Sequence, residues 1–195
     1  MIIGIDIDGV LTDIERFQLD YGSKYFFEND KRSISNPNGY EIMNIFDTSI
    51  EKDNIWWEKY LEFYAKNEPA RHFAGEVIKK LSNEGNKIYI ITARFLTERD
   101  DFLGSKMRSI VKKWLKKNKI YYDKLIFSPE DKRKICKENN VDIMIEDSPK
   151  NISELSEVLP KVICFDALYN QNINKENVIR CYSWYDIYYK IINMN

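Results

Sequence analysis

Two pairs of acidic residues stand where strand-like segments of the sequence end. Asp6 and Asp8 close the opening segment MIIGIDIDG, and Glu146 and Asp147 close the segment DIMIED. In an open parallel sheet, ligands bind outside the carboxyl ends of the strands, where the loops converge. Both pairs are therefore expected at one edge of a sheet. Four carboxylates gathered there repel one another, so a cation is expected to hold them ionised.

The side chains around these pairs narrow the choice of cation and of reaction. Oxygen ligands without a histidine or cysteine beside them suit Mg²⁺. Thr92 ends a third strand-like segment, IYIIT, and adds a hydroxyl to the same edge. Phosphoryl transfer requires Mg²⁺, a free carboxylate, a hydroxyl and a lysine, because it depends on positioning and on neutralising negative charge on the phosphoryl oxygens. The residues therefore indicate phosphoryl transfer.

Charge and composition argue against a duplex nucleic-acid binder and against a membrane protein. The 195 residues include 30 Lys and Arg against 31 Asp and Glu, for a formal net charge of -1. A duplex DNA binder needs a basic surface, which this balance does not provide. The lysines within 112–119 are predicted to lie on the solvated face of an amphipathic helix. No uncharged apolar run approaches the ~18 residues of a membrane span, and no signal peptide is recognised.

The three cysteines are predicted to be reduced core residues. They are Cys136, Cys164 and Cys181, an odd number at wide spacing and without a CxxC pair. Two of them stand in apolar strand-like segments, where cysteine behaves as a small hydrophobic residue. Together with the lack of a recognisable leader, this usage predicts a cytoplasmic protein.

The segments that must position the acidic residues alternate regularly from residue 73 onward. The strand-like segments are 87–92, 125–128, 142–147, 161–166 and 178–183, and helix-like segments separate them. Such alternation predicts a parallel sheet covered by helices on both faces. The chain is long enough for one α/β domain with a small insertion. The predicted fold class is α/β, with a Rossmann-like, doubly wound parallel sheet.

Residues 14–72 break this alternation. The segment has no strand-like run, is rich in aromatic residues and holds a polar loop between two helix-like runs. We predict a small helical cap inserted after the first strand, so that the core comprises 1–13 and 73–195. The aromatic stripe within 56–64 is expected to form the core of the cap, and a platform for stacking a base is the alternative. His72, at the boundary, has no partner in view and is expected to have no catalytic role.

Four short segments, in order, resemble the motifs of the haloacid dehalogenase-like hydrolases. DIDGVLTD (6–13) resembles the first motif, DxDGxxxD, and IITAR (90–94) resembles the second. Lys132 stands where the lysine of the third motif opens a helix, and IEDSPKN (145–151) resembles the acidic fourth motif. The resemblance covers nearly the whole chain. Within that superfamily it favours the 5′(3′)-deoxyribonucleotidase group, in which the cap also lies between the first two motifs.

The resemblance implies a nucleophile, a proton carrier and a metal site. It assigns Asp6 as the nucleophile, which forms an aspartyl-phosphate and splits hydrolysis into two easier steps. It assigns Asp8 as the general acid for the leaving alcohol and then as the base for water. The implied ligands of Mg²⁺ are Asp6, the backbone carbonyl of Asp8, and Asp147. Glu146 is expected to orient these ligands from behind, and direct metal contact is its alternative.

The resemblance also implies which residues hold the phosphate. Thr92 and the backbone N–H of Ala93 are expected to bind phosphate oxygens, and Lys132 is expected to neutralise charge between nucleophile and phosphate. Arg94 marks a departure, because the deoxyribonucleotidase group often has Thr-Ser-Pro where this chain has Thr-Ala-Arg. Two roles are open for Arg94: contact with the substrate phosphate, or a place at the surface or behind the residues that touch substrate.

The expected function is therefore a Mg²⁺-dependent phosphatase acting on a small phosphomonoester. A (deoxy)nucleoside monophosphate is the favoured substrate, and a sugar phosphate or another phosphorylated metabolite is the alternative. A non-catalytic phosphate-binding module of the same fold is a third reading. The joint presence of Asp6, Asp8, Thr92, Lys132 and Asp147 argues against it. The sequence predicts no protein partner and no oligomeric state.

Overall fold

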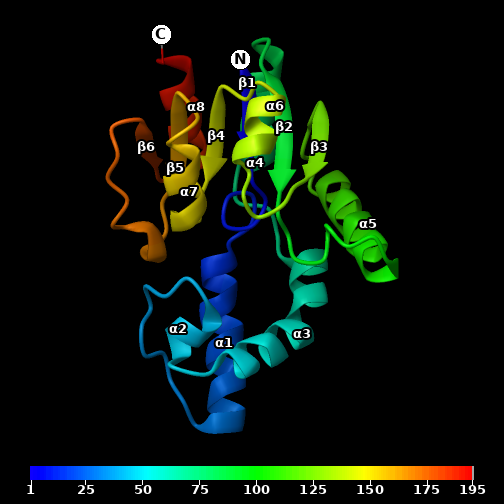
Figure 1. Ribbon diagram of the computed structural model, residues 1–195, viewed down its shortest axis with the longest axis vertical. Coiled ribbons are helices and arrows are strands. Elements are labelled where there is room, and N and C mark those ends of the chain that lie inside the picture. The colour runs from blue at the N-terminus through cyan, green and yellow to red at the C-terminus, as the bar shows by residue number, and fades with distance from the viewer. Residues whose placement is uncertain (195) are drawn as a thin grey trace.

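The computed structural model describes residues 1–194, and six parallel strands form the centre of this part of the chain (Figure 1). The strands are β1 (Ile2–Ile5), β2 (Lys87–Thr92), β3 (Lys124–Phe127), β4 (Ile143–Glu146), β5 (Lys161–Phe165) and β6 (Val178–Cys181). Their order in the sheet is β3-β2-β1-β4-β5-β6. The chain thus winds outward from β1 in both directions, which confirms the predicted α/β, doubly wound fold class.

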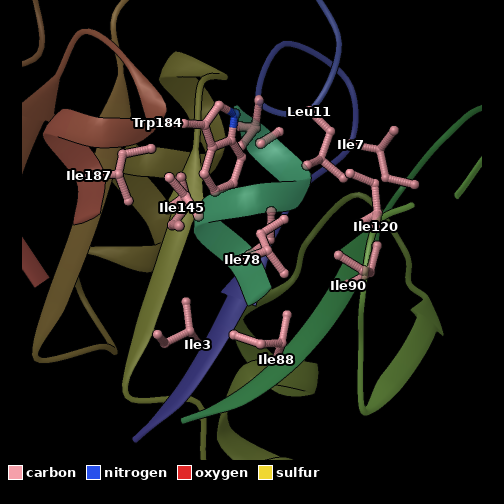
Figure 2. Packing of buried hydrophobic residues seen from close by; sticks show 14 of the residues in the cluster. Ile3, Ile7, Leu11, Ile78, Ile88, Ile90, Ile120, Ile145, Trp184 and Ile187 are labelled. Atoms are coloured by element: carbon pink, nitrogen blue, oxygen red, sulfur yellow. The ribbon is translucent and has the colours of Figure 1, made fainter. Parts of the chain in front are cut away.

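Helices cover both faces of the sheet. They are α4 (Ala74–Asn83), α5 (Phe102–Lys117), α6 (Arg133–Glu138), α7 (Pro149–Leu155) and α8 (Trp184–Ile192). Apolar residues of α4, α5 and α8 share one core cluster with the sheet, and those of α6 and α7 share another. Figure 2 shows Ile78 of α4 and Trp184 of α8 over the strand residue Ile145. Consecutive strand residues such as Ile90 and Ile91 enter different clusters, so the continuous apolar runs of the strands reflect burial on both faces.

The segment 14–72 forms helices and has a core of its own. It contains α1 (Ile14–Asp30), α2 (Ile42–Phe46) and α3 (Ile50–Asn67). The buried residues that hold these helices together are Phe17, Phe26, Ile42, Ile45, Phe46, Trp56 and Tyr64. The three helices lie beyond the carboxyl ends of the strands (Figure 1). The limits of this cap at residues 14 and 72 stay a prediction.

Both ends of the cap are held at the same place on the core. The chain enters α1 from the loop after β1, and the Asp13 side chain caps the helix by accepting a hydrogen bond from the Arg16 N–H. It leaves past Arg71, whose guanidinium pairs with Asp13 at 3.0 Å. The backbone N–H of Arg71 also donates to the carbonyl of Leu11 at 2.7 Å. The entry and the exit of the cap therefore meet at one ion pair.

Gly22 of α1 is expected to resist replacement by alanine. In most helices this change stabilises, because glycine is about 0.8–1.0 kcal/mol less favourable than alanine. Here the added Cβ would meet the buried Phe46 ring of α2, with the ring Cζ at 2.7 Å. We expect Gly22→Ala to lower the free energy of unfolding by about 1–3 kcal/mol, the usual cost of overpacking. Urea unfolding measures this change.

Lys24→Ala, at an exposed position two residues further along the same helix, is the matched control. It should change the free energy of unfolding by less than about 0.5 kcal/mol, as is usual for a change away from packed contacts. A Gly22→Ala variant that is more stable than the wild type would contradict the tight packing of α1 on α2.

Candidate active site

Three acidic side chains meet where β1 and β4 end. Asp6 follows β1 directly, Glu146 is the last residue of β4, and Asp147 follows it. The two strands are hydrogen-bonded neighbours in the sheet. One carboxylate oxygen from each residue lies within 4.8 Å of those of the other two. All three side chains are buried. The expectation that both acidic pairs share one sheet edge is met by these three residues.

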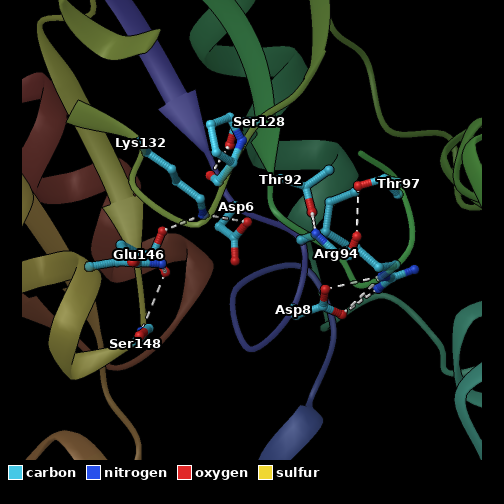
Figure 3. Close-up of polar contacts among 12 residues, drawn as sticks. Asp6, Asp8, Thr92, Arg94, Thr97, Ser128, Lys132, Glu146 and Ser148 are labelled. Carbon is cyan, nitrogen blue, oxygen red and sulfur yellow. Dashed lines mark hydrogen bonds and ion pairs between the residues drawn. The ribbon is translucent and has the colours of Figure 1, made fainter. Parts of the chain in front are cut away.

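One lysine stands among these carboxylates. The Nζ of Lys132 lies 2.8 Å from Oδ1 of Asp6 and 2.8 Å from Oε2 of Glu146 (Figure 3). Its side chain is 1% exposed, so water does not screen these ion pairs. Burial alone would lower the pKa of Lys132, but attraction to the two carboxylates raises it above its ordinary value. The ammonium therefore stays charged. Lys132 immediately precedes α6, as predicted for the lysine of the third motif.

The negative charge at this edge exceeds what Lys132 neutralises. Burial raises the pKa of Asp6 to about 7, although Lys132 acts in the opposite direction. The pKa of Asp147 is raised well above its ordinary value, chiefly by burial and then by Glu146 and Asp6. Three buried carboxylates beside a single ammonium offer hard oxygen ligands and leave negative charge that is not neutralised. These residues fit a divalent cation such as Mg²⁺.

Asp147 is held in place by residues that the sequence analysis did not find. The hydroxyl of Tyr169 donates to Oδ2 of Asp147, and the side-chain amide of Asn170 donates to the Asp147 carbonyl at 2.9 Å. Both residues lie in a short 3₁₀ helix, Leu168–Asn170, within the long connection after β5. The length of that connection was its only signal in the sequence.

The glycine of the first motif lies directly against the same aspartate. Gly9 has a φ of +80°, and a Cβ at this position would fall on the Asp147 carboxylate. Glycine is the residue that adopts this backbone conformation without strain and leaves room for the side chain. The motif therefore brings the loop after β1 onto the residue after β4.

Asp8, the fourth predicted carboxylate, pairs with Arg94 rather than joining this cluster. The Nη2 of Arg94 lies 2.5 Å from Oδ1 of Asp8, and Nε lies 3.0 Å from Oδ2 (Figure 3). The side chain of Arg94 is 2% exposed and that of Asp8 is 22% exposed. A planar guanidinium that meets a carboxylate through two nitrogen atoms fixes its orientation as well as balancing its charge. The structure thus places Arg94 behind Asp8 and not at the surface.

The predicted phosphate-binding residues at the end of β2 lie beside this pair. Thr92 is fully buried, and its Oγ1 accepts a hydrogen bond from the backbone N–H of Arg94 at 3.2 Å. Ala93 lies between them in the chain. The ends of β1, β2 and β4 therefore bring a hydroxyl and four carboxylates to one side of the sheet, beneath the cap, and the segment before α6 adds Lys132.

Comparison with known proteins identifies the family. The family model described as 5′ nucleotidase, deoxy (pyrimidine), cytosolic type C protein (NT5C) matches residues 1–195. The chain belongs to this nucleotidase family. A nucleotidase from Clostridium acetobutylicum is 34% identical over 189 residues, which cover 95% of this chain and 91% of that protein. A provisionally named 5′(3′)-deoxyribonucleotidase from Chlorobaculum tepidum is 28% identical over 96% of this chain and 88% of its own length.

Solved structures share the fold of this chain. A haloacid dehalogenase-like family hydrolase from Streptococcus pneumoniae matches with a TM-score of 0.65 at 13% identity, over 97% of each chain. A D,D-heptose 1,7-bisphosphate phosphatase from B. bronchiseptica, solved with magnesium and phosphate, matches with a TM-score of 0.56 at 12% identity, over 100% of this chain and 99% of that one. These likenesses show the shared fold. With the family match, they confirm the predicted haloacid dehalogenase-like hydrolase.

The family match also confirms the predicted class of enzyme, a phosphoric monoester hydrolase of the 5′-nucleotidase kind. No helix within residues 1–194 is long and apolar enough to cross a membrane.

The raised pKa of Asp147 predicts how the metal-free protein responds to pH. Its folded-state pKa lies above its unfolded value, so the folded protein holds a proton that the unfolded chain releases. The free energy of unfolding therefore falls as the pH rises from the unfolded-state pKa of Asp147 to its folded-state pKa. With a chelator at about pH 8, Asp147→Asn should raise the Tm by a few degrees, since about 1 kcal/mol shifts the Tm by roughly 2–4 °C at this chain length. Thermal melts measure the difference.

The gain in Tm should shrink as the pH falls and protons neutralise the wild-type site. Asp100→Asn makes the same change on an exposed loop and should leave the Tm unaltered at every pH. A metal-free Asp147→Asn variant that melts below the wild type at about pH 8 would contradict the crowding of carboxylates in this site.

Proposed function

We propose that the protein is a Mg²⁺-dependent nucleotidase that hydrolyses a (deoxy)nucleoside monophosphate through an aspartyl-phosphate. The observation that carries the proposal is the buried cluster of Asp6, Glu146 and Asp147 around Lys132, at a sheet edge that a helical cap covers. The family match supports the nucleotide as substrate. The matching family is described as cytosolic, which supports a cytoplasmic location for this protein.

The reaction starts at Asp6. Lys132 holds Oδ1 of this carboxylate and leaves Oδ2 to attack the phosphorus atom. As the bond from Asp6 to phosphorus forms, the ester bond breaks and Asp8 gives a proton to the leaving oxygen. A water molecule then attacks the same phosphorus, Asp8 takes its proton, and the bond to Asp6 breaks. Inorganic phosphate leaves, and both aspartates return to their starting states.

The neighbouring residues hold the phosphoryl group during these steps. The Thr92 hydroxyl and the Ala93 N–H bind its oxygens, and Lys132 neutralises charge between them and Asp6. Asp6, Asp147 and the backbone carbonyl of Asp8 would hold Mg²⁺. When bound, the ion supplies positive charge to the phosphoryl oxygens and keeps the buried carboxylates ionised.

Trp57, which lies in the cap beside Tyr64, is the best candidate for contact with the base. Tyr64 of α3 reaches the site, with its ring centroid 5.3 Å from the Arg94 guanidinium carbon. Trp57 lies two helical turns earlier on the same face of α3, and its ring centroid is 6.1 Å from that of Tyr64. Trp56, in contrast, is fully buried in the core of the cap. Tyr60 turns toward α1, where its ring meets Tyr21 at 5.6 Å.

The nucleophile assignment predicts that Asp6→Asn abolishes turnover. An amide does not attack phosphorus, yet it has nearly the same shape, so the fold should persist. The measurement is phosphate release from a panel of nucleoside monophosphates and sugar phosphates in Mg²⁺, with circular dichroism to check the fold. Activity within about tenfold of the wild type would exclude Asp6 as nucleophile, because loss of a covalent nucleophile costs far more.

The same panel tests the metal and the class of substrate. EDTA should remove wild-type activity and added Mg²⁺ should restore it, and Mg²⁺ should raise the wild-type Tm because it binds only the folded site. Activity that persists in excess chelator would overturn the metal site. Faster release from sugar phosphates than from every nucleotide would overturn the proposed substrate but not the chemistry.

The cap assignment predicts that Trp57→Leu weakens nucleotide binding. Stacking a base on an aromatic ring is worth roughly 1–3 kcal/mol, so KM for the preferred nucleotide should rise by about 5- to 150-fold. The kcat/KM for p-nitrophenyl phosphate, which carries no nucleobase, should stay near that of the wild type. Steady-state kinetics on both esters measure the change.

Tyr60→Leu is the matched control, because Tyr60 lies on the same helix and packs against α1. It should leave KM for the nucleotide unchanged. An equal loss on both esters in Trp57→Leu, together with a lower Tm, would assign Trp57 to the core of the cap instead.

A further inference from the structure

We infer that Arg94 is a positioning residue for Asp8, which fixes the carboxylate that exchanges protons with the leaving oxygen and then with water. This inference rests on the proposed function, because it presumes that Asp8 carries the proton. It assigns Arg94 a role in the proton-transfer steps and none in binding the phosphate.

The contact between the two side chains is the first support. Arg94 meets both oxygens of Asp8, through Nε at 3.2 Å and 3.0 Å and through Nη2 at 2.5 Å. Two donors in one rigid plane set the rotation of a carboxylate, which a single point charge does not. Asp8 is partly exposed, so without this contact its side chain would be free to change rotamer.

Arg94 is itself held in place from several sides. Its N–H donates to Oγ1 of Thr92, and its carbonyl accepts from both the N–H and the hydroxyl of Thr97, at 3.0 Å and 2.6 Å. The side chain is buried, and the ring of Tyr64 lies over the guanidinium. A buried group with a fixed backbone and a stacked ring has little freedom to leave its partner.

The same geometry leaves no nitrogen for a phosphate. Nε and Nη2 are engaged by Asp8, and Nη1 is fully buried with no hydrogen-bond partner among the described residues. Binding a phosphate would need at least one of these nitrogen atoms to be free and accessible, and the Arg94 side chain is 2% exposed.

The cap takes part in this positioning through Tyr64. The hydroxyl of Tyr64 lies 2.6 Å from Oγ1 of Thr12, and this threonine donates in turn to the carbonyl of Ile7 at 3.1 Å. Ile7 and Thr12 belong to the loop that carries Asp8. One side chain of α3 therefore contacts both the loop that carries Asp8 and the arginine that orients it. The seating of the cap and the position of the proton carrier are coupled.

The test compares two esters that differ in their need for a proton. Nucleotide hydrolysis expels a poor leaving alcohol, whereas p-nitrophenolate leaves readily without protonation. Arg94→Met should lower kcat for the preferred nucleotide by about 10²-fold, which is the usual effect of a small misplacement of a reacting group. It should lower kcat for p-nitrophenyl phosphate far less. KM for both esters and inhibition by inorganic phosphate should stay near the wild-type values.

Further variants sharpen the test. Asp8→Asn should show the same dependence on the leaving group, and adding Arg94→Met to it should cost nothing more, because both changes remove one function. Arg94→Lys keeps the charge but loses the planar pair of donors, so it should show a smaller loss with the same dependence. If Arg94→Met does not fold, the two esters are compared with Arg94→Lys instead. Arg99→Met, whose arginine pairs with Asp101 on the surface, is the control and should leave both rates unchanged.

Three results would overturn the inference. A weaker inhibition by phosphate with a raised KM on both esters would make Arg94 a phosphate ligand. An equal loss of kcat on both esters with a lowered Tm would make it a structural residue. Losses that multiply in the double variant would show that Arg94 acts apart from Asp8. If instead the wild type hydrolyses neither ester, or if Asp8→Asn shows no dependence on the leaving group, then the proposed function itself fails, and this inference fails with it.

Discussion

The ammonium of Lys132 is the interaction on which this site depends. It lies between Asp6 and Glu146, shielded from water, and it permits carboxylates from two neighbouring strands to be buried side by side. Removing this lysine would leave the buried carboxylates without their counter-charge, which is strongly destabilising. The core thus holds a group of residues that packing alone would not favour. It gains a nucleophile fixed at the end of a central strand.

Most of the core could be predicted from the sequence because two patterns in it agree, the apolar strand-like runs and the helical spacing that follows them. Runs such as KIYIIT end in polar residues, and helical spacing follows each of them, so the strands and their carboxyl ends could be read together. The positions of Asp6, Glu146 and Asp147 at one edge then follow from parallel pairing. The observed strands differ from the predicted segments by only a few residues at their ends.

Contacts between side chains that are far apart in the sequence could not be predicted from it. Tyr169 and Asn170 support Asp147 from the connection after β5, where neither spacing nor composition in the sequence points to a partner. The pairing of Asp8 with Arg94 joins residues that are 86 positions apart, so local pattern did not distinguish it from a phosphate contact. The fully buried Trp56 and its neighbour Trp57 illustrate the same limit, because their different surroundings depend on tertiary packing.

The ion pair between Asp13 and Arg71 joins the two points where the chain leaves and re-enters the core. The segment between these two residues behaves as a loop whose two ends are held together by the core. Its length therefore has only a small effect on the entropy cost of closing it. Parts of that loop far from the site can change in length without altering the sheet, whereas Tyr64 ties α3 to the loop that carries Asp8 and to Arg94. Residues of the cap away from Tyr64 can therefore vary at little thermodynamic cost, while Tyr64 itself is constrained by the groups that it contacts on the core.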